Sequence, residues 1–204
     1  LAVVLFGCGL SLVFKRNAAF ALMTTGILVL LYATSRNLYH LIADGDIGVS
    51  LTNTNKGLSV AFGAFLMAHL LKPGSAGAMA RLTPVILGFF LLCSGIQHFL
   101  YAGFVDYLVP EWLPFTRFWT YSSGIALMVS GFALIIGFKR PLAAAFAGSM
   151  IFLWLLVLHI PRALSLASIN EWTAVFEALY FSATLFLIYW FCKKMPGGIL
   201  LTKD

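Results

Sequence analysis

Long apolar runs, separated by short polar segments, dominate this chain of 204 residues. A helix needs about 20 apolar residues to cross roughly 30 Å of hydrocarbon, and four of the seven runs reach that length. The runs cover residues 1–14, 18–35, 57–71, 83–104, 118–138, 141–160 and 172–192. Only 10% of the residues are charged and 61% are hydrophobic, which is not the balance of a soluble domain. We therefore expect an all-α, polytopic membrane helix bundle with seven visible transmembrane helices.

The basic residues divide unevenly between the two sides that seven alternating helices would create. One side receives nine of them: Lys15, Arg16, Lys72, Arg81, Lys139, Arg140, Lys193, Lys194 and Lys203. The other receives four: Arg36, Lys56, Arg117 and Arg162. Because basic residues accumulate in cytoplasmic loops, the first side, with the C-terminus, is expected to be cytoplasmic. A nucleic-acid surface would need its basic residues on one solvated face, so no nucleic-acid partner is expected.

The N-terminal and C-terminal parts of the sequence resemble each other weakly. An offset of 124 residues places Phe14-Lys15-Arg16 on Phe138-Lys139-Arg140. This pattern predicts one membrane domain, 1–204, made of two parallel four-helix repeats. The first repeat would occupy 1–78 and lack its opening helix, since the chain starts at Leu1 inside an apolar run; the second would occupy 79–204. One missing helix would complete eight spans with both ends inside.

Several ionisable residues fall within the outer parts of the predicted helices. His98 lies about 9 Å below the outer end of its helix, and Glu177 about 7 to 8 Å below the outer end of the last one. A carboxylate in hydrocarbon needs a partner, for which Arg162 and His98 are the candidates. The sequence therefore predicts a polar, ligand-binding pocket from His98, Tyr101, His159, Arg162, Glu177 and Tyr180.

A structural interpretation of the same residues stays open. Histidines near helix ends commonly donate to a carbonyl, Glu177 could belong to a structural ion pair, and Arg162 could extend to the interface. Cys8, Cys93 and Cys192 lie in separate apolar runs without CxxC spacing, so no metal site is expected. Haem is disfavoured because two separate histidines are the sole indication and no CxxCH motif is present.

The segment Val109-Pro110-Glu111-Trp112-Leu113-Pro114 joins two predicted helices on the outer side. Two prolines prevent a long helix, and tryptophans favour the membrane interface. We expect a short interfacial element, with Pro110, Trp112, Pro114 and Trp119 as its interface residues. Its simplest role is an aromatic anchor, and a binding lid is the alternative.

These residues also carry a family resemblance. Residues 83–192 resemble the four-helix unit of DoxX-type membrane proteins, and residues 1–71 resemble a degenerate or incomplete second copy. The motif consists of His98-Phe99, Tyr107, the 109–114 segment, Tyr121 and Gly124. That family is linked to membrane oxidoreductases, including a quinone-reducing subunit, and to complexes with soluble redox partners. The acidic residue that the family places three positions after the glycine is Leu127 here.

Three functions remain open, and the sequence leaves enzymatic activity undecided. The first is a membrane subunit of a quinone-linked redox system, with quinone in an outer-leaflet pocket and further membrane or soluble redox subunits as partners. The second is a non-catalytic accessory or assembly subunit of a larger complex. The third, a small-molecule transporter, is disfavoured because no charged residue lies at the predicted midplane. A bacterial cytoplasmic membrane fits the topology and the resemblance.

Overall fold

The computed structural model describes residues 2–15 and 17–194, so the predicted cytoplasmic charges Arg16 and Lys203 lie outside the described residues. All elements of the described part are helices, which confirms the all-α class. Five helical stretches are long and apolar enough to cross a membrane: Ala18–Asp44, Gly77–Leu100, Thr116–Ile136, Arg140–Leu166 and Ile169–Lys194. The chain is therefore an integral membrane protein. The runs 1–14 and 57–71 fall on α1 (Ala2–Val13) and α4 (Val49–Leu71), which are not among these five in the described residues.

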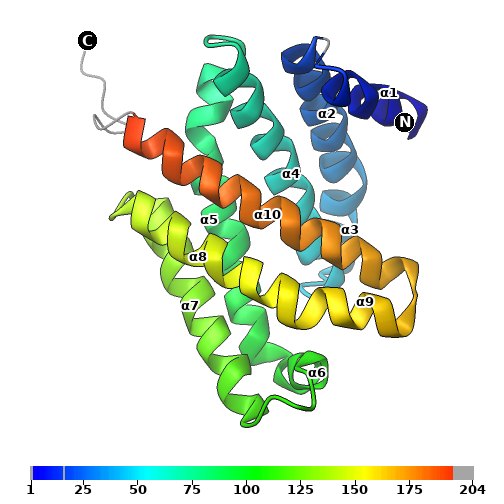
Figure 1. The fold of residues 1–204 in the computed structure, drawn as a ribbon, viewed down its shortest axis with the longest axis vertical. Helices are drawn as coiled ribbons and strands as arrows, with labels where there is room; N and C mark the ends of the chain where they lie inside the picture. The colour runs from blue at the N-terminus through cyan, green and yellow to red at the C-terminus, as the bar shows by residue number, and fades with distance from the viewer. Residues whose placement is uncertain (1, 16, 195–204) are drawn as a thin grey trace. The chain divides into compact units, whose positions relative to one another are not determined.

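Contacts divide the chain into two compact units, with the boundary between Phe90 and Leu91 inside α5 (Gly77–Leu100). The first unit begins with α1 and continues with α2 (Ala18–Tyr32), the π-helical segment η1 (Ala33–Leu38) and α3 (Tyr39–Asp44). These three form one continuous helix, which runs antiparallel to α4 and packs along it (Figure 1). The core of this unit includes Phe62 and Phe65 of α4. The buried Thr83 hydroxyl of α5 donates to the Phe62 carbonyl oxygen at 2.9 Å.

Asp46 fixes the start of α4. Its Oδ1 accepts from the backbone N–H groups of Gly48 at 2.8 Å and Val49 at 3.2 Å, and its Oδ2 accepts from Ser50 at 2.9 Å. These amides lack partners inside the helix, and a carboxylate also suits the positive end of the helix dipole. The hydrogen bonds, first from Ser50 and then from Gly48, lower the pKa of Asp46 below its ordinary value of 3.8.

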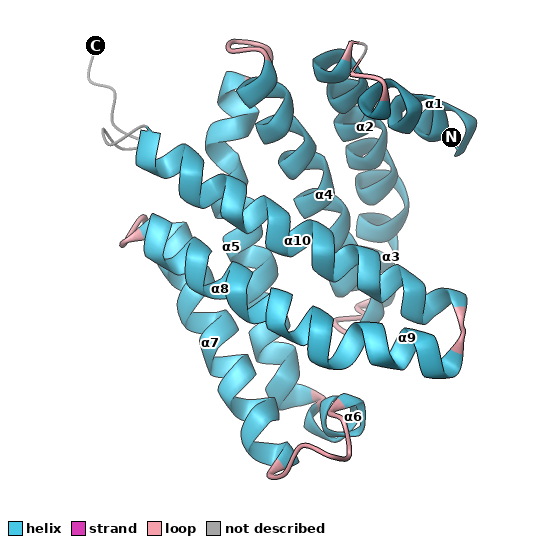
Figure 2. Cartoon of the chain, viewed as in Figure 1, coloured by secondary structure: helices cyan, strands magenta, loops and turns pink. Residues whose placement is uncertain are grey.

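The second unit holds the rest of α5, then α6 (Ala102–Leu108), α7 (Thr116–Ile136), α8 (Arg140–Trp154), the π-helical η2 (Leu155–His159), α9 (Ile160–Leu166) and α10 (Ile169–Lys194). α8 and α10 lie side by side over most of their length, and a turn after α9 joins them (Figure 2). The Ser182 hydroxyl donates to the Gly148 carbonyl oxygen at 3.0 Å across this pair. Small residues allow such close approach between helices in lipid.

Arg140 caps the C-terminal end of α7. Gly137 adopts φ +84°, the left-handed conformation that commonly ends a helix. The buried Arg140 then donates from Nε to the Leu134 carbonyl oxygen at 2.8 Å and from Nη2 to that of Ile135 at 3.2 Å. Its positive charge suits the negative end of the helix dipole. This basic residue of the predicted cytoplasmic side therefore also stabilises the end of a helix.

Candidate functional site

The predicted site residue His98 lies where α5 and α7 cross. The crossing is so close that a Cβ atom on Gly95 would lie 2.6 Å from the Gly124 carbonyl oxygen. A Cβ atom on Gly124 would lie 2.9 Å from the His98 Cβ. The His98 Nδ1 is 2.8 Å from the Ser94 carbonyl oxygen, which can only accept, so Nδ1 carries the hydrogen. His98 is thus oriented by its own helix and packs against α7.

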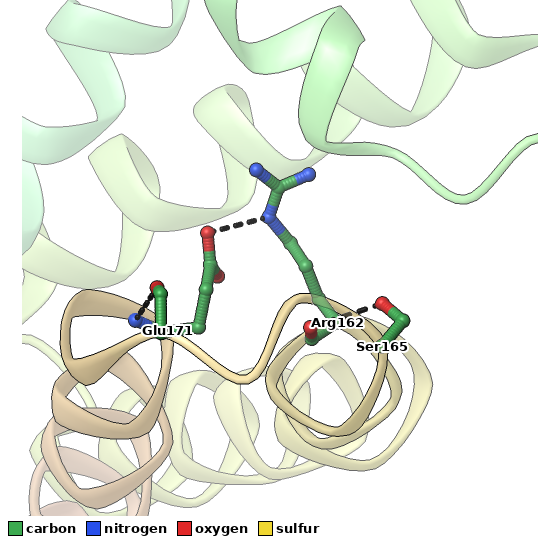
Figure 3. A network of polar contacts seen from close by, with 4 residues as sticks. Arg162, Ser165 and Glu171 are labelled. Atoms are coloured by element: carbon green, nitrogen blue, oxygen red, sulfur yellow. Dashed lines mark hydrogen bonds and ion pairs between the residues drawn. The ribbon is translucent and has the colours of Figure 1, made fainter.

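Arg162 of α9 pairs with Glu171 in the first turn of α10, whereas the sequence offers it, beside His98, as a candidate partner of Glu177. The Arg162 Nε lies 3.0 Å from Glu171 Oε1, and both side chains are about one-fifth exposed, at 21% and 18% (Figure 3). The turn between α9 and α10 is so short that these two residues face each other across it. The guanidinium also lies over the Tyr107 ring, 5.3 Å from its centroid. Arg162 therefore links α6, α9 and α10.

The six predicted pocket residues are distributed over this unit. His98 lies on α5, Tyr101 directly after it, His159 ends η2, and Glu177 and Tyr180 lie on α10. Within the described chain, His98, Tyr101 and Arg162 form no hydrogen bond, ion pair or ring contact with one another. Tyr101 is exposed, whereas His159, Glu177 and Tyr180 are partly buried. The common polar pocket stays a prediction, and the contacts of Arg162 and His98 belong to two separate places.

Asp106 on α6 was not among the predicted site residues, yet it organises the N-terminal end of α7. Its Oδ2 lies 3.1 Å from Arg117 Nε, and its Oδ1 accepts from the buried Thr120 hydroxyl at 2.6 Å. Arg117 in turn donates from Nη1 to the Tyr121 hydroxyl at 3.4 Å. Arg117 is expected on the less basic side of the membrane, and Asp106 precedes the same connecting segment, which is the available signal for their pairing.

A groove lies between the 109–115 loop, α7 and α8 in this unit. Its volume is about 520 Å³. The lining residues are mostly aromatic or aliphatic: Trp112, Leu113, Phe118, Trp119, Ser122, Ser123, Ala126, Phe146, Met150, Leu153, Trp154 and Val157. We call this hollow the aromatic groove. It includes the predicted interface residues Trp112 and Trp119, whereas its α8 wall was not predicted.

Three hydrogen-bonding and ring contacts shape the aromatic groove. Trp119 Nε1 donates to the Pro114 carbonyl oxygen at 2.9 Å, which ties the loop to α7. Trp154 Nε1 donates to Ser123 Oγ at 3.1 Å, which ties α8 to α7. The Trp119 and Trp154 rings meet edge to face, with centroids 6.1 Å apart. Such contacts hold large aromatic side chains in defined orientations.

The sequence model of one protein family, described as a domain of unknown function (DUF8561), matches residues 87–194. This match covers more than half of the chain. The chain belongs to the DUF8561 family. The matched region contains the aromatic groove, the Asp106 contacts and the Arg162–Glu171 pair, and it ends with α10. No curated protein and no solved structure matches the chain significantly.

The described residues contain no group of three or more His, Cys, Asp or Glu side chains that could hold a metal ion. Cys8, Cys93 and Cys192 are free thiols. Among the described residues that line the aromatic groove, none is acidic, basic, histidine, cysteine or tyrosine. The groove therefore suits the binding of an apolar molecule through aromatic faces and two serines, without a titratable group of its own.

Proposed function

We propose that this protein is an integral membrane subunit of a quinone-linked redox system, and that it holds a lipophilic, planar molecule of the quinone class in the aromatic groove. The observation that carries the proposal is the groove itself, with Trp112, Trp119 and Trp154 in its wall. Planar rings stack favourably against aromatic side chains, and a few placed polar groups fix their orientation. A volume of about 520 Å³ lies within the range of small-molecule sites.

The position of the groove along the helices supports a ligand that arrives from the bilayer. Its residues on α7 extend from Phe118 to Ala126, which lies ten positions after the start of the helix at Thr116. At 1.5 Å per residue, the groove reaches about 15 Å along α7, or roughly half the hydrocarbon thickness. A molecule with a polar ring and an apolar tail fits such a groove.

The electrons in this proposal come from a partner. A quinone-binding subunit requires an electron donor, and the resemblance of the 98–124 motif to DoxX-type proteins favours a membrane or soluble redox subunit in that role. The basic residues at the α7–α8 turn and at the end of α10 favour a cytoplasmic location for those two helix ends. A bacterial cytoplasmic membrane with an interior C-terminus is part of the same proposal.

Tryptophan fluorescence tests ligand binding directly. The chain has five tryptophans, of which three line the groove and two, Trp172 and Trp190, lie on α10. In lipid nanodiscs, a benzoquinone with a ten-carbon tail should quench the wild-type fluorescence saturably. A variant with the three groove tryptophans replaced by Phe should lose the saturable component, and the matched control Trp172→Phe/Trp190→Phe should keep it. Quenching that rises linearly, as expected from partition into lipid alone, would refute the proposal.

We also propose that all seven predicted helices cross the membrane and that the chain contains two related units. Two 27-residue helices support the relation: Ala18–Asp44 and Arg140–Leu166 each contain 15 α-helical residues followed by a π-helical segment. π-helical turns are rare, so their recurrence at the same point is informative. On this proposal α1 corresponds to α7 and α4 to α10.

Contacts between helices, and the backbone conformation before them, also support two related units. Gly26 of α2 packs against Phe65 of α4, and Gly148, 122 residues later, packs against Phe186 of α10. Positive φ values precede both long helices, at Lys15 and Asn17 and again at Gly137 and Lys139, also 122 residues later. This spacing is two residues shorter than the offset of 124 that aligned the Phe-Lys-Arg motifs.

A non-catalytic accessory subunit is the second candidate. It is favoured by the absence of titratable side chains among the described residues that line the groove, since quinone reduction needs proton donors. Native mass spectrometry of the protein extracted gently from its membrane separates the two functions. A quinone mass retained by this chain favours the binding subunit, whereas partner subunits without any small molecule on this chain favour the accessory role.

A further inference from the structure

The hydrogen bond between Trp154 and Ser123 lies in the wall of the aromatic groove, since both residues line it. It joins α8 to α7 over a sequence separation of 31 residues. Ser123 is 8% exposed and lies seven positions after the start of α7, or about 10 Å along the helix. The groove therefore has a positioned hydroxyl group well below the 109–115 loop.

The Ser123 hydroxyl retains an unused donor. A serine hydroxyl has one hydrogen to donate and two lone pairs, and an indole N–H can only donate. The Trp154 bond therefore occupies a lone pair of Ser123 and leaves its hydrogen available. Within the described residues, the Ser123 hydroxyl donates to no acceptor, whereas the neighbouring Ser122 hydroxyl donates to the Trp119 carbonyl oxygen at 3.3 Å.

Two other polar side chains of the groove lining, Trp119 and Ser122, are already engaged. Trp119 Nε1 is bound to the Pro114 carbonyl oxygen, and Ser122 is bound to its own helix. Accepting a hydrogen bond from Trp154 also polarises the Ser123 hydroxyl and makes it a stronger donor. Ser123 thus offers the occupant a buried, positioned hydrogen-bond donor, whereas the indole N–H of Trp112 belongs to a side chain that is 68% exposed.

We infer that Ser123, positioned by Trp154, recognises a carbonyl oxygen of the groove's occupant and makes the site prefer a quinone to the corresponding quinol. This inference rests on the proposed function and specifies which form of the ligand the site selects. A quinone carries carbonyl oxygens, which only accept, whereas the hydroxyl groups of a quinol also bring hydrogens that need acceptors. A saturated acyl chain offers no acceptor and leaves the buried Ser123 donor unpaired.

The test compares oxidised and reduced ligand on matched variants. The probes are a benzoquinone with a ten-carbon tail, its quinol kept reduced without oxygen, and decane as the plain hydrocarbon. Binding is read from saturable tryptophan quenching in nanodiscs, and decane is read by competition. Wild-type protein should bind the quinone roughly three- to tenfold more tightly than the quinol, the value of about one hydrogen bond.

Four variants make the role of Ser123 specific. Ser123→Ala should weaken quinone binding roughly three- to tenfold and abolish the preference, and Ser123→Thr, which restores a hydroxyl, should recover both. Trp154→Phe should keep quinone binding but reduce the preference, because without the Trp154 hydrogen bond the Ser123 side chain can reorient to accept from a quinol. Ser130→Ala serves as the matched control, since Ser130 is a buried serine of α7 outside the groove lining and should behave as wild type.

The outcomes distinguish this inference from the proposed function. If Ser123→Ala binds the quinone with wild-type affinity and wild-type preference, the inference is wrong and the proposed function stands. If competition shows that decane binds the groove as tightly as the quinone does, the groove accommodates a lipid chain and Ser123 does not recognise a carbonyl oxygen. If the wild-type protein shows no saturable quenching by either probe, the proposed function fails and the inference fails with it.

Discussion

A single carboxylate, that of Asp106, serves two partners of very different exposure. Arg117 is 59% exposed at the side chain, whereas Thr120 is 1% exposed. An ion pair to an exposed arginine contributes less than about 1 kcal/mol, because water and salt screen it. A buried hydroxyl without an acceptor costs about 1 to 3 kcal/mol. The Thr120 hydrogen bond therefore makes the larger contribution at this site.

Replacing Asp106 by Ala should consequently destabilise the protein by about 1 to 3 kcal/mol, and replacing Arg117 by Ala should cost less than about 1 kcal/mol. The measurement is the apparent unfolding midpoint in detergent, read by fluorescence. Thr120→Val is the matched control, because it removes the buried hydroxyl together with the need for an acceptor. Equal losses in Asp106→Ala and Arg117→Ala would show that the ion pair dominates.

Asp46 adds a pH dependence at the start of α4. Its pKa is lower in the folded protein than in the unfolded chain, so its contribution is fully present above the unfolded value of about 3.8 and is lost as the pH falls through the folded value. Between pH 7 and pH 5, replacement by Asn should leave the pH dependence of the unfolding midpoint unchanged. Below pH 4 the wild type should lose stability relative to Asp46→Asn. If the unfolding midpoints of the wild type and Asp46→Asn change in parallel down to pH 3, the charge of Asp46 does not stabilise the start of α4.

At the scale of elements, the α5–α7 crossing depends on two facing glycines. A Cβ atom on Gly95 would lie 2.6 Å from a backbone oxygen of α7, so the helices must separate to accept it. Overpacking of this kind costs about 1 to 3 kcal/mol. Gly95→Ala should therefore lower the apparent unfolding midpoint, as read by resistance to added SDS.

Gly103 on α6 provides a control at a position where an added Cβ atom has free space. It has no atom within 4 Å of an added Cβ. Gly103→Ala should be neutral or stabilising by up to about 1 kcal/mol, because alanine is the better helix former. If both substitutions lower the midpoint equally, close approach is not the reason for the glycine at position 95.

The sequence predicted elements better than it predicted their ends and contacts. The apolar run 118–138 corresponds to α7 at Thr116–Ile136, because hydrophobicity and helix length are both local properties. The run 18–35 stops at polar Arg36 and Asn37, yet the helix continues to Asp44 through η1, where Asn37 Nδ2 donates to the Asn53 carbonyl oxygen at 3.3 Å. A partner 16 residues away overrides the local signal.

Contacts between residues distant in sequence also limited the prediction of the candidate site. Trp112 and Trp119 were predicted as interface residues because tryptophan itself favours the membrane interface. The groove that they line depends on Trp154 and its bond to Ser123, which nothing in the local sequence of either helix indicates. Likewise, the pairing of Arg162 with Glu171 follows from the tight turn after α9, whereas depth along the helices suggested Glu177.

At the scale of the whole molecule, the number of membrane spans depends on α4 as well as on the 12-residue α1. Helix α4 has 23 residues, long enough to cross, but its first two turns are rich in polar side chains, including Asn53, Asn55 and Lys56. If α4 crosses, its two ends lie on opposite sides of the membrane. If it does not, the loop at Asp46 and the turn after Leu71 lie on the same side.

Labelling of single cysteines in sealed membrane vesicles distinguishes these arrangements. With Cys8, Cys93 and Cys192 replaced by Ser, a seven-span protein should label Asp44→Cys and Lys72→Cys from opposite sides. Glu111→Cys and Lys139→Cys, which flank the apolar helix α7, provide the reference pair. Asp44→Cys should then match Glu111→Cys, and Lys72→Cys should match Lys139→Cys. If the reference pair behaves as expected while Asp44→Cys and Lys72→Cys share one side, α4 does not cross, and its correspondence to the membrane-spanning α10 is lost with it.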